Sequence, residues 1–557
     1  MADEHFDAVV VGSGFGGAVT AFRLAEAGMS VCVLERGKAY PPGSFQRSPW
    51  GMSRSLWDPS EGLHGLFNLW EFRGLGAIVA SGLGGGSLIY SNVLIRKDRS
   101  TFVREDAAGE GFESWPVTYE DLEPHYERHE AMLDAQPYPY DDTPKTNALI
   151  EAAGQLGLEC YRPKLAVTFA GADGRPAERE PVADEHANLH GRTRLTCRRC
   201  GECNFGCNDG SKYTLDFNYL SFASLRHGAT IRTRCEAKTF QPRRGGGFDV
   251  GYVDHSEAPD DEPRPAPLPV HTISADRLVL SAGTLGTTFL LLRNRESFPG
   301  LSTRLGSGFC GNGDLLTFVR KSHQRVNGER RPRRIEPAFG PVITATIRMK
   351  DALEGGRGRA FYIQDGGYPE VFNWMAEAAD QPGALVRTIR LAWRLLRLWL
   401  HLGGDHDIGA ELSEMLGRAP ASSTTLPLFA MGRDIPDGTM TLSRDGRLAC
   451  DWNKRRSNPV FEDVRTTGRE MARVLDGSFR DNLPWYFGRV ITVHPLGGCP
   501  MGLDERQGVV DSYGRVFGHP GLVVADGSVM PGPTGPNPSN TIAALAHRFS
   551  ERMIADS

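Results

Sequence analysis

Two polar residues near the C-terminus, His494 and Asn537, stand among neighbours that suit a reaction centre. His494 follows the apolar run of GRVITVHPLGGCPMG and precedes a proline and two glycines. An imidazole at the end of a strand can take the proton of an alcohol while a hydride leaves the adjoining carbon. A histidine that only packs in the core is the alternative. The glycine-rich flank favours the catalytic interpretation.

Asn537 lies in GPNPSNTIAALAHR, just before an apolar helix. The partial positive charge of that helix N-terminus can face a ring on which negative charge develops during reduction. An asparagine that only shapes a turn between two prolines is the alternative. Upstream, the strand-like LVVADGS offers Asp526 and Gly527 as a further contact to a cofactor.

Four cysteines crowd into one short stretch, with the spacing C-x2-C-x2-C-x3-C. They are Cys197, Cys200, Cys203 and Cys207. This spacing is typical of the bacterial ferredoxin run, without the proline that usually follows it, and therefore favours an iron–sulfur cluster. Four thiolates also suit tetrahedral zinc, and reduced cysteines that only pack are a third interpretation.

The elements that must position these residues begin at the N-terminus, where FDAVVVG reads as a buried strand and AVTAFRLAEAG as a helix. Between and after them lie Gly12, Gly14, Phe15 and Gly17, and then a second strand that ends near Glu35. The spacing is that of the Rossmann fingerprint: glycines for the turn, for the approach of a pyrophosphate and for helix packing, and an acid for the ribose. Gly16 is the alternative third glycine, and a glycine turn in another doubly wound sheet is the alternative to the motif. The motif does not distinguish NAD from FAD.

A second glycine-rich stretch, ASGLGGGSLIYSNVLIR at residues 80–96, contains Gly84, Gly85 and Gly86. So many glycines would destabilise a regular element, so a ligand is expected to pass close to the backbone there. A bulky flat ligand is the simplest explanation, and a flexible surface loop is the alternative.

Length and composition describe a globular protein of 557 residues, enough for about two to four domain-sized units. Lys and Arg number 63 against 68 Asp and Glu, so a net charge of -5 disfavours nucleic acid as a partner. The acidic start MADEHFD does not resemble an export signal, so we expect a cytoplasmic protein and no disulfide framework.

A long amphipathic helix is expected over residues 381–404, QPGALVRTIRLAWRLLRLWLHLGG. Its four arginines argue against a membrane span. Packing of the helix on its own domain is the simplest interpretation, and docking on a membrane surface is the alternative.

Together these motifs resemble the glucose-methanol-choline (GMC) oxidoreductase family, in its cholesterol-oxidase-like branch. The residues that carry the resemblance are VVVGSGFGGAVTAFRLAEAG, GLGGGSLIYSNV, SAGTLGT, HPLGGCPMG and ADGSVMPGPTGPNPSNTIAALAHR. The resemblance implies FAD rather than NAD, with His494 as the base and Asn537 as its partner. It also implies that residues 81–93, including Ser91, Asn92 and Val93, approach the flavin, and that Ala237 lies near the adenine.

The implied fold class is α/β, a Rossmann-like FAD-binding domain with an inserted α+β substrate-binding domain. The FAD-binding domain is expected to comprise residues 1–41, 73–99, 212–318 and 491–557. The substrate domain is expected to comprise 42–72, 100–211 and 319–490, with the cysteine loop at 197–207.

The implied reaction is FAD-dependent oxidation of an alcohol, on a bulky apolar molecule such as a steroid. Steroid oxidases of this kind carry a glutamate that serves isomerisation, whereas the matching stretch GRAPASSTTLPLFAM has no carboxylate. Cys197, Cys203 and Cys207 are similar in spacing to the iron–sulfur subgroup of FAD-dependent glucose dehydrogenases. Electrons would then pass to oxygen or, through a cluster, to a protein or dye acceptor. A flavin/iron–sulfur electron-transfer protein and a non-redox FAD-dependent lyase are the alternatives.

Overall fold

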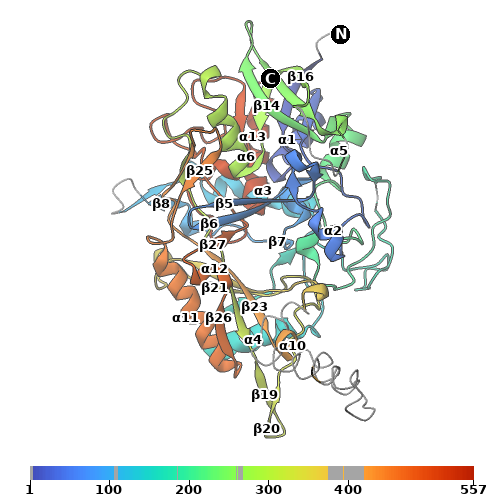
Figure 1. Ribbon diagram of the computed structural model, residues 1–557, viewed down its shortest axis with the longest axis vertical. Coiled ribbons are helices and arrows are strands. Elements are labelled where there is room, and N and C mark those ends of the chain that lie inside the picture. The colour runs from blue at the N-terminus through green and yellow to red at the C-terminus, as the bar shows by residue number, and fades with distance from the viewer. Residues whose placement is uncertain are drawn as a thin grey trace.

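The computed structural model describes residues 4–105, 111–184, 186–258, 260, 267–373, 393 and 420–557. The helix predicted over 381–404 lies outside these residues, apart from Trp393. No helix in the described part combines the length and the apolar character needed to cross a bilayer. In Figure 1 one sheet with its helices occupies the upper part of the molecule, a second sheet the lower part, and both chain termini lie at the upper end.

The upper sheet has seven strands in the order β13-β2-β1-β16-β15-β14, with β28 also paired to β16. Its parallel strands are β1 (His5–Val11), β2 (Val31–Glu35), β13 (Thr230–Thr233), β28 (Leu522–Val524) and the end of β16 (Val270–Leu280), while β14 (Cys235–Pro242) and β15 (Phe248–Asp254) run antiparallel to their neighbours. The valines of β1 are almost fully buried, as expected for a strand covered on both faces. The Rossmann half of the predicted fold class is confirmed.

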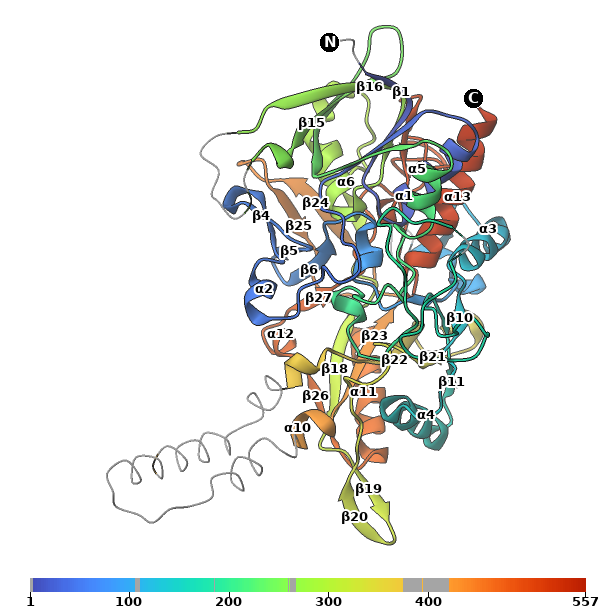
Figure 2. The ribbon, with the colours of Figure 1, turned by 90° about the vertical axis from the view of Figure 1, so that its right-hand side faces the viewer.

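Helices from both ends of the chain cover this sheet side by side. Figure 2 shows α1 (Phe15–Glu26), α5 (Tyr219–Leu225) and α13 (Ser539–Ala555) together on one side, with α3 (Tyr119–Met132) next to them. The Tyr126 hydroxyl of α3 lies 3.0 Å from the Thr541 hydroxyl of α13. The first and last elements of the chain therefore belong to one layer, which brings the N-terminal glycine loop close to the C-terminal motifs.

The lower sheet is antiparallel and has six strands in the order β11-β21-β22-β23-β18-β26. They are β11 (Glu159–Tyr161), β21 (Thr346–Met349), β22 (Phe361–Asp365), β23 (Leu426–Gly432), β18 (Leu315–Arg320) and β26 (Ser478–Asp481). Helices α4 (Pro144–Leu156) and α11 (Asn458–Val474) share its apolar core. This sheet and its helices form the α+β part that the sequence predicts.

A three-stranded sheet, β27-β6-β5, lies between the two larger ones in Figure 1. It consists of β5 (Phe67–Phe72), β6 (Leu75–Ala80) and β27 (Val490–Thr492), and β27 runs parallel to β6. Strand β6 leads into the second glycine-rich stretch, and β27 ends two residues before His494. The pairing therefore brings these two parts of the predicted site together.

The remaining helices and strands are shorter or lie at the edges. They are α2 (Pro49–Ser53), β3 (Trp57–Asp58), β4 (Leu63–His64), β7 (Val93–Leu94), β8 (Val103–Glu105), β9 (Phe112–Ser114), β10 (Gln136–Pro137), β12 (Lys164–Leu165), α6 (Gly283–Arg293), β17 (Ser307–Phe309), β19 (His323–Val326), β20 (Glu329–Pro332), α10 (Pro420–Ser423), β24 (Gly438–Leu442), β25 (Leu448–Asp451) and α12 (Leu483–Tyr486).

Candidate active site

The N-terminal glycine loop is packed too closely for side chains at most of its glycines. Gly12 has a φ of +96°, and a methyl group added to it would lie 2.3 Å from the carbonyl oxygen of Ser281. A methyl group on Gly17 would lie 2.0 Å from the Gly12 oxygen, and one on Gly16 would lie 1.4 Å from the Ala525 oxygen. Both candidates for the third glycine are therefore required, Gly17 for packing within the motif and Gly16 for packing on the C-terminal strand.

Gly14 is different, because a methyl group placed on it meets no atom of the described structure within 4 Å. It stands just before α1, whose N-terminus carries partial positive charge. Open space in front of a helix N-terminus suits the pyrophosphate of a dinucleotide. The loop thus fits the role predicted for its middle glycine.

Ser13 joins three predicted cofactor segments. Its backbone N–H and its hydroxyl both donate to Glu35 Oε2, at 3.1 and 2.6 Å, and the Gly84 N–H donates to the Ser13 hydroxyl at 3.0 Å. The second glycine-rich stretch also touches the first, since a methyl group on Gly85 would lie 2.6 Å from the Gly14 Cα atom. The acid and both glycine loops therefore meet at one place.

Asn92 supplies a further sign that a polar ligand belongs here. Asn92 is fully buried and has a φ of 67°. Neither its side-chain Oδ1 nor its Nδ2 has a hydrogen-bond partner in the described structure. A buried amide without partners costs free energy, so a ligand that bonds it would relieve that cost. Ser91 beside it donates to Asn204 Oδ1 at 2.8 Å, and Val93 is buried in β7. The orphaned amide, the open Gly14 and the placement of Glu35 together fit an FAD molecule.

Gly14 allows a direct test of this fit. Replacing Gly14 with valine is expected to leave the fold of the FAD-free protein intact, because the side chain enters open space. The same side chain would occupy the path of the pyrophosphate, so FAD affinity should fall by about 100-fold or more, equivalent to about 2.7 kcal/mol. Titration of FAD into the deflavinated protein measures the change. Gly154→Val is the matched control, since a methyl group on Gly154 also meets no atom within 4 Å, and Gly154 lies on the exposed side of α4, a helix that packs on the other core. Equal FAD affinity in both variants would contradict the assignment.

His494 lies just after β27, with its side chain 18% exposed. Its Nδ1–H donates to Asp314 Oδ1 at 2.7 Å. The other oxygen of Asp314, Oδ2, accepts the backbone N–H groups of Val493 and His494 at 2.8 and 3.1 Å, and lies 2.9 Å from the Thr492 hydroxyl. No partner of His494 Nε2 occurs among the described residues, which leaves this nitrogen available to a substrate.

Asn537 lies two residues before α13 and is buried. Gln364 of β22, itself fully buried, donates from Nε2 to Asn537 Oδ1 at 3.0 Å. The loop that carries Asn537 is held by Asn312, which donates to the Pro536 carbonyl at 3.0 Å and accepts from the Gly535 N–H at 3.0 Å. With its oxygen engaged by Gln364, Asn537 keeps its own N–H groups for a ligand.

Asn312 and Asp314 belong to one turn, Gly311–Asp314, just before β18. One residue of this turn holds the Asn537 loop and the other holds His494. Neither residue is predicted from the sequence, nor is Gln364, and the only signal is the cluster of polar residues that interrupts the apolar FCGNGDLLTF. The tertiary structure therefore adds three residues to the candidate site and shows that one turn supports both predicted catalytic side chains.

Asp434 lies behind the same turn and accepts the Gly311 N–H at 2.9 Å. Burial raises the pKa of its carboxyl group to about 7, an effect that the Gly311 and Gly313 N–H groups and Arg359 oppose and Asp314 reinforces. The folded protein therefore binds this proton more tightly than an unfolded chain, in which the pKa is near 3.8.

The raised pKa of Asp434 predicts a pH dependence of stability with a defined sign. Its contribution is present in full below about pH 4 and is lost as the pH rises through about 7, because the unfolded chain gives up the proton first. The Asp434→Asn variant should therefore become more stable relative to the wild type as the pH rises over this interval. Urea unfolding of both proteins at several pH values measures the difference. If the difference in free energy of unfolding between the two proteins does not change with pH, the raised pKa of Asp434 is contradicted.

The remaining predicted cofactor residues are Asp526, Gly527 and Ala237. Asp526 is buried and accepts the Gly283 N–H at 2.9 Å and the Ser528 N–H at 2.9 Å. Gly527 accepts the Gly497 N–H at 3.0 Å, which ties this turn to the His494 motif. Ala237 lies in β14, next to a bulge in its pairing with β15.

The four cysteines lie in one neighbourhood but do not form a metal site. Burial raises the pKa of the Cys197 thiol well above its usual range, and the adjacent thiols of Cys203, Cys207 and Cys200 add to the shift. Burial likewise raises the pKa of Cys200 to about 12. All four are free, and the part of the chain that the structure describes contains no group of three or more His, Cys, Asp or Glu side chains arranged to hold a metal ion. The predicted iron–sulfur cluster is therefore not supported, and nor is zinc.

The cysteine loop is nevertheless attached to the segment predicted to approach the flavin. Lys212 is almost fully buried, and its Nζ donates to the carbonyl oxygens of Leu88, Tyr90 and Cys203 at 3.0, 2.8 and 2.8 Å. Several buried carbonyl groups are thereby satisfied by one ammonium group. Lys212 thus ties the cysteine loop at Cys203 to the stretch that carries Leu88 and Tyr90.

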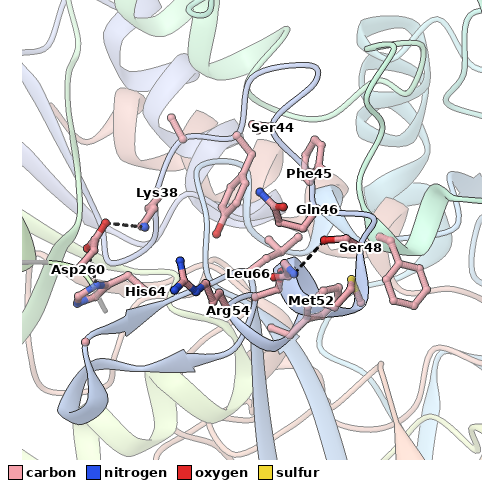
Figure 3. Close-up of a pocket in the computed structure, with 18 residues that line it drawn as sticks. Lys38, Ser44, Phe45, Gln46, Ser48, Met52, Arg54, His64, Leu66 and Asp260 are labelled. Carbon is pink, nitrogen blue, oxygen red and sulfur yellow. Dashed lines mark hydrogen bonds and ion pairs between the residues drawn. The ribbon is translucent and has the colours of Figure 1, made fainter. Parts of the chain in front are cut away.

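A cavity of about 400 Å³ lies apart from the predicted chemistry. Figure 3 shows its lining by segment 38–67, with Lys38 and His64 both reaching Asp260 at one end; Phe205 completes it. None of the predicted cofactor or catalytic residues lines it. This cavity is therefore not the space in front of His494.

Comparison with known proteins agrees with this arrangement. Residues 436–546 match the family described as GMC oxidoreductase, and residues 10–41 match an NAD(P)-binding Rossmann-like domain. The chain is 30% identical to cholesterol oxidase of Mycobacterium tuberculosis over 563 residues, which covers 98% of this chain and 90% of that protein. It is 23% identical to 2-methyl-1,2-propanediol dehydrogenase of Mycolicibacterium austroafricanum, covering 98% and 95%. The crystal structure of pyridoxine 4-oxidase from Mesorbium loti has the same fold, with a TM-score of 0.59 at 16% identity and 98% coverage of both chains.

The fold and the site define an FAD-dependent oxidoreductase, and the relatives place it more closely. The chain belongs to the GMC oxidoreductase family, in its cholesterol-oxidase-like branch.

Proposed function

We propose that this protein oxidises an alcohol to the corresponding carbonyl compound, with His494 as the base and Asn537 as the group that orients the substrate. The observation that carries the proposal is the placement of His494, whose Nδ1–H is bonded to Asp314 while its Nε2 remains unpartnered among the described residues. A neutral imidazole nitrogen of this kind is the usual acceptor of a hydroxyl proton.

In the proposed reaction the hydroxyl proton moves to His494 Nε2 as the C–H bond breaks and the C=O bond forms. Bound FAD would supply the acceptor for the hydride that leaves the carbinol carbon. The side-chain oxygen of Asn537 already accepts a hydrogen bond from Gln364. Its N–H groups therefore remain to orient the substrate oxygen or the flavin ring. Glu35, Gly14 and Asn92 hold the cofactor. The cysteines take no part in the proposed reaction, since their arrangement does not fit a cluster.

The substrate class is proposed to be a bulky apolar alcohol such as a steroid. Relatives named cholesterol oxidase support this class, whereas relatives named for a small diol and for 6'''-hydroxyparomomycin C do not. Strand β23 carries no carboxylate, and Asp365 on the neighbouring β22 is fully buried and paired with Lys145 at 2.7 Å. A sterol should therefore be oxidised without isomerisation, giving the unconjugated ketone.

The test is anaerobic mixing of the flavin-loaded protein with a panel that includes cholesterol, other sterols and 2-methyl-1,2-propanediol. Loss of the oxidised flavin absorbance with a sterol, and recovery of the unconjugated ketone, is the expected result. If only the diol reduced the flavin, the substrate would be a small alcohol and not a steroid. If no alcohol reduced the flavin, the proposed reaction would be wrong. Product formed without any electron acceptor would point instead to the lyase.

The electron acceptor is proposed to be oxygen or another oxidant that reaches the reduced flavin directly. Iron and zinc analysis of the purified protein tests this point independently of the alcohol. Metal below one equivalent is expected, because the cysteines do not form a ligand set in this structure. Stoichiometric iron with acid-labile sulfide would instead support an iron–sulfur cluster that passes electrons to a separate acceptor protein.

We also propose that the FAD-binding domain comprises residues 1–41, 73–99, 212–318 and 491–557, and the substrate domain residues 42–72, 100–211 and 319–490. All strands of the seven-stranded sheet fall inside the ranges assigned to the FAD-binding domain, and five strands of the six-stranded sheet fall inside the substrate domain. The exception is β18 (Leu315–Arg320), which crosses the limit at 318. The two domains are thus joined directly behind the Gly311–Asp314 turn.

A further inference from the structure

The carboxylate of Asp314 is used asymmetrically. Oδ1 accepts from His494 Nδ1 at 2.7 Å, whereas Oδ2 accepts the N–H groups of Val493 and His494 at 2.8 and 3.1 Å. The direction of these two N–H groups is fixed by the backbone conformation. The Thr492 hydroxyl, 2.9 Å from Oδ2, also approaches this oxygen. The orientation of the carboxylate is therefore set by the main chain and not by the imidazole.

We infer that Asp314 is the positioning residue that selects the tautomer of His494, keeping the proton on Nδ1 and leaving Nε2 free to accept one from the substrate. The inference rests on the proposed function for the role of Nε2, but the choice of tautomer is a property of the resting protein. A histidine nitrogen bonded to a carboxylate carries the proton, and the other nitrogen then has the lone pair. Asp314 also stands opposite the positive charge that the ring acquires when Nε2 takes a proton.

The geometry makes an unusual demand on an asparagine at this position. The amide oxygen of Asp314→Asn must take the Oδ2 place, because two backbone N–H groups point there. The amide NH₂ group then faces His494 Nδ1 and donates to it. That bond stabilises the Nε2–H tautomer, in which the nitrogen that should accept the substrate proton already carries one. The most conservative change in shape is thus expected to be the most damaging.

Alanine at the same position has a different effect. Asp314→Ala removes the orienting partner but donates nothing to Nδ1, so water can bond there and both neutral tautomers are accessible. The expected loss is about 10- to 100-fold, the range typical of a metal-bound histidine that loses its orienting partner. Asp314→Asn should lose about 10⁴-fold, as expected when a catalytic histidine is held in the wrong tautomer. A purely structural role for Asp314 predicts the opposite order, with the isosteric asparagine milder than alanine.

The first experiment observes the tautomer without turnover. Flavin-loaded wild type, Asp314→Asn and Asp314→Ala are labelled with ¹⁵N-histidine, and the His494 signals are assigned by their loss in His494→Ala. The Nδ1–H form is expected in the wild type and the Nε2–H form in Asp314→Asn. The same tautomer in both proteins would overturn the inference. This readout holds even if no alcohol reduces the flavin, so failure of the proposed function is distinguished from failure of the inference.

The second experiment measures anaerobic flavin reduction by the best alcohol of the panel, with FAD content and melting temperature recorded for each variant. The expected order of rates is wild type, then Asp314→Ala, then Asp314→Asn. Raising the pH should not restore Asp314→Asn, because both of its competing tautomers are neutral. Equal rates in the three proteins, or a slower alanine variant, would overturn the inference. If Asp314→Asn fails to bind FAD, the inference is tested by the rate of Asp314→Ala and by the tautomer of His494 in the wild type. A wild-type rate in Asp314→Ala, or the Nε2–H tautomer in the wild type, would overturn it.

Discussion

Replacing His494 with alanine is expected to slow anaerobic reduction of the bound flavin by alcohol about 10²- to 10⁴-fold, the range typical of removing a general base. The side chain bonds only through Nδ1 to Asp314 among the described residues and is partly exposed, so its loss should not disturb the fold. The proton of the substrate hydroxyl would then have to pass to water, which is a poorer and less well-placed acceptor. Stopped-flow recording of the flavin absorbance at saturating alcohol measures the rate.

Two controls define what that result means. The His271→Ala variant removes a partly exposed histidine of β16 that pairs with Glu257 and is not one of the predicted site residues, and it should reduce its flavin at the wild-type rate. FAD content should be the same in both variants, because the predicted cofactor contacts do not include either histidine. An unchanged rate in His494→Ala would remove this residue from the chemistry. A variant that no longer holds FAD would instead assign it a structural role.

The largest stability effect is expected at the buried ion pair between Lys145 of α4 and Asp365 of β22, both fully buried. Their charged groups are 2.7 Å apart, and Asp365 also accepts the N–H groups of Thr344 and Ala345 at 2.8 and 2.7 Å. Asp365→Ala leaves an ammonium group buried without its counter-charge, which costs about 3–5 kcal/mol. A downward shift of the urea midpoint of unfolding measures this loss.

The asymmetry of the pair sharpens the prediction. Lys145→Met should be less damaging than Asp365→Ala, because the carboxylate keeps two backbone N–H donors when the lysine is removed. Asp445→Ala, in the exposed turn after β24, is the control and should leave the midpoint unchanged. A midpoint shift in Asp365→Ala no larger than that of the control would show that the pair does not stabilise the fold.

Part of this site can be predicted from the sequence, because it depends on residues that are close together along the chain. A short strand, a glycine turn and a helix follow one another within residues 6–28, and each step has its own signal: valines for the buried strand, Gly12 for the left-handed turn and Gly17 for close packing. His494 and Asn537 are recognisable for a similar reason, since the prolines and glycines around them mark special backbone next to a strand and a helix. Such features depend on neighbours a few residues away.

The partners of these residues are not local, and the sequence does not reveal them. Asp314 is 180 positions from His494, Gln364 is 173 positions from Asn537, and Asn312 is 224 positions from the Pro536 carbonyl that it holds. An aspartate or an asparagine in a polar turn has the same local signature whether it faces solvent or a catalytic ring. The cysteines show the converse, because a regular spacing in sequence does not ensure that the thiols converge on one point in space.

By itself, then, the sequence determined the Rossmann half, the dinucleotide loop and the identity of the two catalytic candidates, because strand, turn and helix signals act over short stretches of chain. Only the tertiary structure decided that one turn, Gly311–Asp314, supports both candidates and that Gly16 as well as Gly17 must lack a side chain. The physical reason is that these contacts arise when the two sheets and both chain ends pack together. Packing joins residues whose separation along the chain carries no information about their distance in space.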